Sequence, residues 1–305
     1  MHIFIIGAGA IGKALAVLLQ QAGKAVTLLR GSTNDVPAHT QQLQVTLADG
    51  QTITAEIRTQ SLDHFTHLNG LIVLTSKSFG NERLAHLLRP KTGNAPLVIL
   101  QNGLGVEQPF IREHFTAVYR CVLFVTSQVE NTIRFKPVAP CPIGHIDGTP
   151  GLEDDIAALL DTPHFRFRGE KNIQPVIWKK AIINSVFNSV CPLLEVDNGI
   201  FHRNAEALNI ARGIITECLA VAALQGVTLS PAAIEENLLQ ISRLSDGQLI
   251  STLQDIRRQR DTEIDTLNIA IARIAAEQGA EALVKATSLL GELTKLKSLQ
   301  ARQAI

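Results

Sequence analysis

The chain is poor in cysteine and has no net charge. Its 305 residues include four cysteines, and no two of these form a C-x-x-C pair or a zinc-ligand spacing: Cys121, Cys141, Cys191 and Cys218. We therefore expect reduced, mostly buried thiols and no metal site. Lys plus Arg and Asp plus Glu are equal at 28 each, so no overall field attracts nucleic acid or an anionic membrane.

Long apolar runs are also missing. None approaches the ~20 residues that a membrane span needs. The apolar start, residues 1–6, is short, lacks a basic region and runs directly into glycines, unlike a signal peptide. These absences predict a cytoplasmic protein with neither a membrane nor a nucleic-acid partner.

The first part of the chain has the pattern of a parallel α/β sheet. Short Val-, Ile- and Leu-rich runs without alternation are typical of strands covered on both faces. Four such runs stand at Ile3–Ile6, Ala25–Leu29, Leu71–Thr75 and Leu97–Leu100. Two segments, 43–57 with a turn at Asp49-Gly50 and 122–135 with a turn near Glu130-Asn131, resemble β-hairpins.

The rest of the chain is dominated by helical periodicity. Helices are predicted at about 174–190, 204–225, 230–242, 248–258 and 262–278, with one more to the end. The sequence thus predicts an α/β fold with an N-terminal Rossmann-type doubly wound sheet, residues 1–168, and a C-terminal all-helical domain, residues 169–305.

A G-x-G-x-x-G motif follows the first predicted strand and opens a helix. Its residues are Gly7, Ala8, Gly9, Ala10, Ile11 and Gly12. The first glycine permits a tight turn, the second lets a pyrophosphate approach the backbone, and the third lets helix and strand pack closely. The helix N-terminus offers free N–H groups to the phosphates. The alternative is a glycine-rich turn without a ligand.

Polar residues follow three predicted strands. Arg30 ends the second strand, where an NAD-specific fold would have Asp or Glu. A cation with a nearby hydroxyl, Ser32, suits a 2′-phosphate, which favours NADP. Lys77 could bind a phosphate or ribose, and Asn102 the nicotinamide or the substrate. Each could also be an ordinary surface or turn residue.

The predicted helix 174–190 carries Lys180, Asn184 and Asn188 at intervals of four, so they share one face. The residues around them are mainly Ile, Val, Phe and Ala, and buried polar groups in such a helix need partners. A ligand with oxygen atoms would supply them; a polar network between helices is the alternative.

Two polar residues further along, Ser251 and Glu263, would lie ~120° apart on one ideal helix. They can share a site only if that helix breaks between them or the site wraps around it. The arginines between them are better explained as a solvated face.

Taken together, these motifs resemble the ketopantoate reductase (2-dehydropantoate 2-reductase) family over nearly the full length. The resemblance is carried by G-A-G-A-I-G, T-S-K, Q-N-G-L-G, W-K-K-A-I-I-N-S-V-F-N, D-N-G, S-T-L-Q-D-I-R and T-E-I-D, in this order. It implies an NADP-binding Rossmann domain, a helical substrate and catalytic domain, and an active site in the cleft between them. The implied reaction is NADPH-dependent reduction of 2-dehydropantoate to (R)-pantoate, a step toward pantothenate and coenzyme A.

The resemblance also implies residue roles. Lys180 would be the general acid, and Glu263 would face both the nicotinamide ribose and the substrate. Asn102 would contact cofactor and substrate, and Thr126 would offer a backbone contact to the cofactor. The remaining substrate ligands would be Asn184, Asn188, Asn198 and Ser251.

Two other functions stay open at this stage. One is NADPH-dependent reduction of a different branched 2-keto acid on the same scaffold. The other is NADP binding by a sensor without turnover, although a sensor has no need of the proton donor Lys180. Whichever function holds, we expect a monomer or a homodimer.

Overall fold

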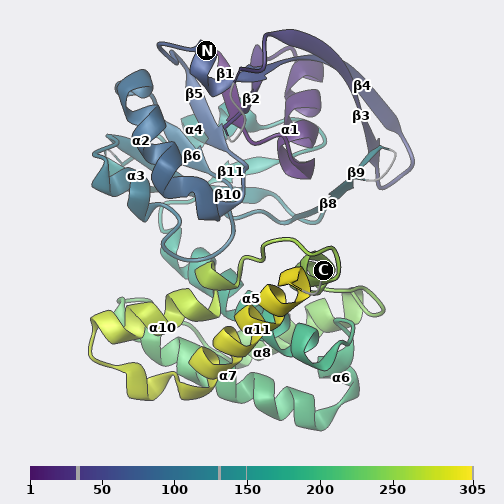
Figure 1. Cartoon of the computed structure of the whole chain (residues 1–305), viewed down its shortest axis with the longest axis vertical. Helices are drawn as coiled ribbons and strands as arrows, with labels where there is room; N and C mark the ends of the chain where they lie inside the picture. The colour runs from purple at the N-terminus through teal and green to yellow at the C-terminus, as the bar shows by residue number, and fades with distance from the viewer. Residues whose placement is uncertain (32–34, 130–131, 149, 304–305) are drawn as a thin grey trace. The chain divides into compact units, whose positions relative to one another are not determined.

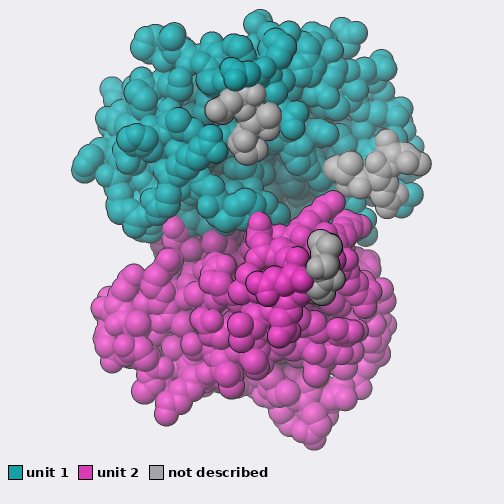
Figure 2. Space-filling model, in the orientation of Figure 1, with its two compact units in different colours: residues 1–101, 106–173 teal, residues 102–105, 174–305 magenta. Residues whose placement is uncertain are grey.

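The computed structural model describes residues 1–31, 35–129, 132–148 and 150–303. They form two compact units (Figure 2). Unit 1 comprises residues 1–101 and 106–173, and unit 2 comprises residues 102–105 and 174–305.

Unit 1 is built on a sheet that has eleven strands in the described part of the chain. Across the sheet their order is β11-β10-β7-β6-β5-β1-β2-β4-β3-β9-β8. The strands are β1 Ile3–Ile6, β2 Val26–Arg30, β3 His39–Leu47, β4 Thr52–Ser61, β5 Leu71–Leu74, β6 Leu97–Ile99, β7 Ala117–Cys121, β8 Val125–Val129, β9 Ile133–Pro137, β10 Cys141–Gly148 and β11 Phe167–Gly169. All four predicted strands are confirmed, with small shifts at their ends.

The centre of this sheet is parallel and doubly wound. The strands β4, β2, β1, β5, β6 and β7 lie side by side and run in one direction. β1 lies between β2 and β5, so the strand order reverses at its carboxyl end, where open α/β sheets bind ligands. The predicted Rossmann-type fold is confirmed.

Helices cover both faces of the sheet (Figure 1). Successive residues of β1 point to opposite faces, as in any strand. Ile3 and Ile5 belong to the apolar core on the face covered by α1 (Ala10–Gln21) and α4 (Glu153–Leu160). Phe4 and Ile6 pack on the other face, with α2 (Asn81–Thr92) and α3 (Gln108–Arg112). Burial on both faces explains why the strands lack polar alternation.

Both predicted hairpins form, and they extend the sheet. β3 pairs antiparallel with β4 around Gly50, whose φ of +87° suits a tight turn. β8 pairs antiparallel with β9, while its predicted turn at Glu130-Asn131 lies outside the described residues. β9 joins β3 in parallel, and β8 contacts α1, the helix that follows the glycine motif.

The described residues of unit 2 form helices and connecting loops, with no strand among them. Its helices are α5 Gln174–Leu194, α6 Ile200–Arg203, α7 Ala205–Leu224, α8 Pro231–Leu244, α9 Ser251–Arg257, α10 Asn268–Glu277 and α11 Lys285–Gln303. The helix predicted from residue 262 begins only at Asn268, because a 3-10 turn, η3 (Ile264–Thr266), precedes it.

The two units divide after Ile173 rather than after Arg168. The reason is that β11, at residues 167–169, still pairs with β10 and so belongs to the sheet. The observed division differs from the predicted one at a second place. Residues 102–105, which follow β6, belong to the helical unit 2.

One described helix, α7, is long and apolar enough by composition to cross a membrane, in contrast to the expectation from its sequence. Within unit 2 it packs against α5, α6, α8 and α11. Arg212 forms an ion pair with Glu235 of α8, and the carboxylate of Glu217 accepts hydrogen bonds from Ala286 N and Thr287 N at the start of α11.

All four cysteines are buried and carry free thiols. Burial raises the pKa of the Cys191 thiol to about 12 and that of the Cys218 thiol to about 12. The thiolate is the reactive form, so these two groups are chemically inert at neutral pH.

Candidate functional site

The first and third glycines of the motif are required by packing within unit 1. Gly7 has a φ of +125°, and a Cβ there would lie 2.4 Å from Ser76 N. A Cβ on Gly12 would lie 1.9 Å from Gly7 O and 2.5 Å from Thr75 Oγ1. The start of α1 therefore lies directly against the end of β5.

Packing within unit 1 does not require a glycine at the second position of the motif, Gly9. Gly9 has an ordinary φ of −79°, and a Cβ there would meet nothing within 4 Å in the described structure. It is the N-cap of α1, and no side chain among the described residues caps the helix. The N–H groups of Ala10, Ile11 and Gly12 at this end have no intrahelical acceptor. Open space and unused donors fit the pyrophosphate of a dinucleotide.

This difference predicts opposite effects for two alanine substitutions. Gly12→Ala should destabilise unit 1 by about 1–3 kcal/mol, because the new methyl group overlaps Gly7 O. Gly9→Ala should leave the melting temperature nearly unchanged and weaken binding of a dinucleotide such as NADPH, because its methyl group would enter the space predicted for the phosphates. Thermal unfolding and NADPH titration of both variants measure this; wild-type affinity in Gly9→Ala would contradict the assignment.

Two cations follow the strands that flank β1. Arg30 is the exposed last residue of β2, and Lys77 is exposed directly after the end of β5. Ser32, the predicted hydroxyl partner of Arg30, lies outside the described residues. Thr126 lies on β8, the edge strand that contacts α1. The roles of Arg30, Lys77 and Thr126 in cofactor binding stay predictions.

The loops around the glycine motif are held by a buried amide pair. Asn81 Nδ2 donates to Gln101 Oε1 at 2.7 Å, and Gln101 Nε2 donates to Asn81 Oδ1 at 2.8 Å. Gln101 Nε2 also donates to Ser76 O at 2.9 Å, and Asn81 Nδ2 to Val106 O at 2.8 Å. This pair fixes the segments that follow β5 and β6.

A buried ion pair supports the same loops. Arg120 of β7 pairs with Glu107, and Arg120 Nη2 donates to Gln101 O at 3.2 Å. The sequence reasoning missed both residues. The sequence does contain a signal for this pair. Arg120 is a charged residue inside an otherwise apolar strand, and a charge in such a place needs a buried partner.

The polar face of α5 is present as predicted. Lys180 and Asn184 are half-buried, and Asn188 is 4 % exposed. Within unit 2, α5 contacts both α9 and η3, the elements that carry Ser251 and directly follow Glu263. Four of the predicted substrate residues therefore lie on helices that contact each other: Lys180, Asn184, Asn188 and Ser251.

Asn188 caps α9 from another helix. Its Oδ1 accepts hydrogen bonds from Thr252 Oγ1 at 2.8 Å, Ser251 Oγ at 3.3 Å and Thr252 N at 3.4 Å. Its Nδ2 donates to Asn184 O at 2.9 Å. α9 has no side-chain cap of its own among the described residues, so Asn188 satisfies its first turn. Its predicted role as a direct substrate ligand stays untested; its observed contacts position Ser251.

Asn198 lies in the predicted D-N-G turn. Asp197 Oδ1 accepts from Gly199 N at 2.7 Å, and the hydrogen bond from Arg203 holds the pKa of Asp197 below its usual value. The backbone N–H of Asn198 donates to Gln248 O at 2.9 Å. Its Oδ1 is buried and has no hydrogen-bond partner among the described residues. A ligand hydroxyl would satisfy this acceptor.

Asn102 and Glu263, distant in sequence, meet in unit 2. Asn102 Nδ2 donates to Glu263 Oε2 at 3.5 Å, a long hydrogen bond. The adjoining backbone is tied more tightly, since Leu104 N donates to Thr266 O at 2.8 Å. Gly103 has a φ of +96°, and a Cβ there would lie 2.4 Å from Thr266 O. Close approach at Gly103 thus brings the two side chains together.

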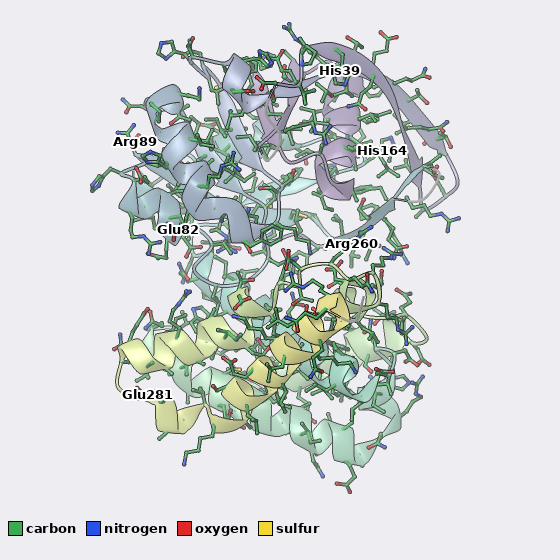
Figure 3. All side chains as sticks on the ribbon, in the orientation of Figure 1. His39, Glu82, Arg89, His164, Arg260 and Glu281 are labelled. Atoms are coloured by element: carbon green, nitrogen blue, oxygen red, sulfur yellow. The ribbon has the colours of Figure 1, made fainter. Side chains whose placement is uncertain are left out.

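The helix break required between Ser251 and Glu263 is observed. α9 ends at Arg257, and Gln259 has a φ of +55°. The intervening Arg257, Arg258 and Arg260 are exposed, as expected for a solvated face; Figure 3 labels Arg260.

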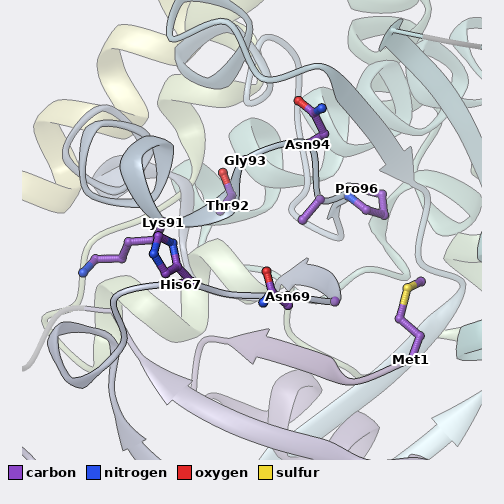
Figure 4. Close-up of a pocket in the computed structure, with 10 residues that line it drawn as sticks. Met1, His67, Asn69, Lys91, Thr92, Gly93, Asn94 and Pro96 are labelled. Atoms are coloured by element: carbon purple, nitrogen blue, oxygen red, sulfur yellow. The ribbon is translucent and has the colours of Figure 1, made fainter.

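A hollow of about 440 Å³ lies elsewhere in unit 1 (Figure 4). Its lining includes Met1, His67, Asn69, Lys91 and Thr92. It lies at the amino ends of β1 and β5, whereas ligands of open α/β sheets bind at carboxyl ends. It is therefore separate from the glycine motif.

The fold and the glycine loop define a two-unit α/β protein with a dinucleotide-binding type of sheet. Two family models match it: "Ketopantoate reductase PanE/ApbA" over residues 3–143 and "Ketopantoate reductase PanE/ApbA C terminal" over residues 172–297. The chain belongs to the ketopantoate reductase family, a family of oxidoreductases.

Similar proteins cover almost the whole chain. The 2-dehydropantoate 2-reductase of Pyrococcus abyssi (strain GE5 / Orsay) is 26% identical, covering 92% of this chain and 93% of that protein. The enzyme of the same name from Pyrococcus horikoshii is 27% identical, covering 95% and 99%.

Solved structures share the fold. A D-mandelate dehydrogenase with NADH and anilino(oxo)acetate has a TM-score of 0.84 at 23% identity, covering 99% of each chain. A dimeric ketopantoate reductase from Staphylococcus aureus has a TM-score of 0.82 at 20% identity, covering 99% of this chain and 100% of that one.

Proposed function

We propose that this protein reduces 2-dehydropantoate to (R)-pantoate with NADPH, a step toward pantothenate and coenzyme A. The observation that carries the proposal is the gathering of polar residues on α5, on α9 and directly before η3, three elements of unit 2 of which α5 contacts the other two. The names of the Pyrococcus relatives support the choice of substrate.

Reduced nicotinamide, when bound, supplies the hydride for the ketone carbon. The N-terminus of α1 binds the pyrophosphate, with Gly9 leaving room for it. Arg30 pairs with the 2′-phosphate, Lys77 binds phosphate or ribose, and Thr126 offers a backbone group.

The residues of unit 2 bind the substrate and supply the proton. Lys180, as an ammonium group, stabilises negative charge on the ketone oxygen and donates a proton to it, which gives the alcohol. Ser251, positioned by Asn188, and Asn184 bind the substrate carboxylate. Glu263, held by Asn102, accepts a hydrogen bond from a hydroxyl group.

Arg30 determines the preference for NADPH in this proposal. Arg30→Ala should raise the Kd for NADPH by about tenfold or more and change the Kd for NADH little, since a charged hydrogen bond contributes about 1.5–3 kcal/mol. Arg58→Ala, an exposed arginine on β4, is the control and should change neither Kd. Equal losses for both cofactors in Arg30→Ala would show that Arg30 does not select the 2′-phosphate.

A substrate panel tests the proposed reaction. NADPH oxidation should be fastest with 2-dehydropantoate. The D-mandelate dehydrogenase likeness makes 2-oxo-2-phenylacetate a useful competitor in the panel. A higher kcat/KM with another branched or aromatic 2-keto acid would show that 2-dehydropantoate is not the preferred substrate, while the reaction class would stand. NADPH binding without any turnover would indicate a sensor.

The proposed setting is the cytoplasm, and the proposed state is a monomer or a homodimer. The structurally similar ketopantoate reductase from Staphylococcus aureus is dimeric, which makes a homodimer a natural candidate here. Light scattering of the whole chain distinguishes the two states.

A further inference from the structure

One aromatic side chain of this protein is exposed, and it lies beside the glycine motif. All eleven Phe, the single Trp and the single Tyr fall in the described ranges. Of these, only Phe79 is exposed, at 68%, on the 3-10 turn Ser78–Gly80 that follows β5. Its position beside the ligand-binding edge of the sheet, rather than its exposure alone, makes Phe79 a candidate ligand contact.

The turn that carries Phe79 is held at both ends. On its amino side, Ser76 O accepts from Gln101 Nε2 at 2.9 Å, and Ser76 N lies against Gly7. On its carboxyl side, Asn81 forms the reciprocal amide pair with Gln101. The backbone that presents Phe79 is therefore fixed before any ligand binds.

The helix that follows this turn, α2, lies close to the end of β2. A Cβ on Gly31 would lie 3.1 Å from Ile6 Cγ2 and 3.4 Å from Leu84 Cδ1. Leu84 is on α2, which begins directly after the turn. Arg30 and Phe79 thus follow the two strands that flank β1, one offering a charge and the other a flat apolar face.

We propose that Phe79 stacks on the adenine ring of the dinucleotide and is a main determinant of its affinity. A pyrophosphate at the start of α1 and a ribose at the end of β2 direct the adenosine half toward this edge of the sheet. Purines stack on aromatic side chains whatever the charge of the adjoining phosphates. The inference rests on the dinucleotide part of the proposed function and is independent of the keto acid.

Titration calorimetry of the whole chain with NADPH and with adenosine 2′,5′-bisphosphate tests the stacking. Phe79→Ala and Phe79→Leu should each raise both Kd values by about tenfold, and Phe79→Trp should keep them near wild type. Leu244→Ala, which removes an exposed apolar side chain of α8, is the matched control and should change neither. Melting temperatures should stay close to wild type because Phe79 is exposed.

Wild-type Kd values in Phe79→Ala would overturn the inference, and so would wild-type values in Phe79→Leu, since leucine has no flat face. If the stacking pattern holds but no keto acid is reduced, only the proposed reaction fails. If the wild-type chain binds neither NADPH nor NADH, both proposals fail.

Discussion

Lys180→Ala is expected to lower kcat for keto-acid reduction by about 10²–10⁴-fold, the usual contribution of a positioned proton donor. Lys180 is half-buried on the polar face of α5. Without its ammonium group, the developing charge on the ketone oxygen has neither its stabilising cation nor its proton source. The Kd for NADPH should stay near wild type, because the glycine motif belongs to unit 1.

Lys179→Ala is the matched control. Lys179 is the adjacent residue of α5 and is also half-buried, but it points about 100° away around the helix. It should retain turnover near wild type. Steady-state kinetics with saturating NADPH, beside NADPH titration, separate the two effects. Wild-type turnover in Lys180→Ala would remove this residue from the mechanism.

Gly103→Ala is expected to destabilise the protein and to disturb the contact between Asn102 and Glu263. A φ of +96° strains any side chain, and the new Cβ would lie 2.4 Å from Thr266 O. We expect a loss of about 2–4 kcal/mol in the free energy of unfolding. Since the same approach holds Asn102 beside Glu263, kcat/KM should also fall by about tenfold or more in the protein that remains folded.

Gly213→Ala tests whether that effect is specific. Gly213 lies inside α7, and a Cβ there meets nothing within 4 Å in the described structure. Helix propensity predicts a gain of about 0.5–1 kcal/mol with unchanged kinetics. Urea unfolding of both variants measures the difference. Equal stability of Gly103→Ala and wild type would show that the loop is not held as described.

Local sequence signals predict the central strands of the sheet and most of the helices. Uninterrupted apolar runs such as Leu71–Leu74 form the parallel centre of the sheet, because burial on both faces removes the need for alternation. The start of α10 could not be located, since residues 264–266 continue the helical pattern in sequence while their backbone forms a 3-10 turn. The joining of the hairpins into one sheet depends on long-range pairing, as between β3 and β9.

The candidate site was predicted residue by residue but not contact by contact. Periodicity alone places Lys180, Asn184 and Asn188 on one face of α5. Nothing in the local pattern shows that the Asn188 oxygen caps α9, because its donors stand about sixty residues away. The Asn102–Glu263 pair spans a still longer separation and depends on a glycine whose role appears only from its close approach to Thr266.

NADPH-dependent reduction of a 2-keto acid is the central activity proposed for this chain. The most direct measurement is the initial rate of cofactor oxidation, followed by the absorbance of the reduced nicotinamide, with 2-dehydropantoate as substrate and with NADPH and NADH compared in parallel. We predict turnover that requires the keto acid, with a higher kcat/KM for NADPH than for NADH. Absence of turnover with either cofactor would contradict the proposed activity.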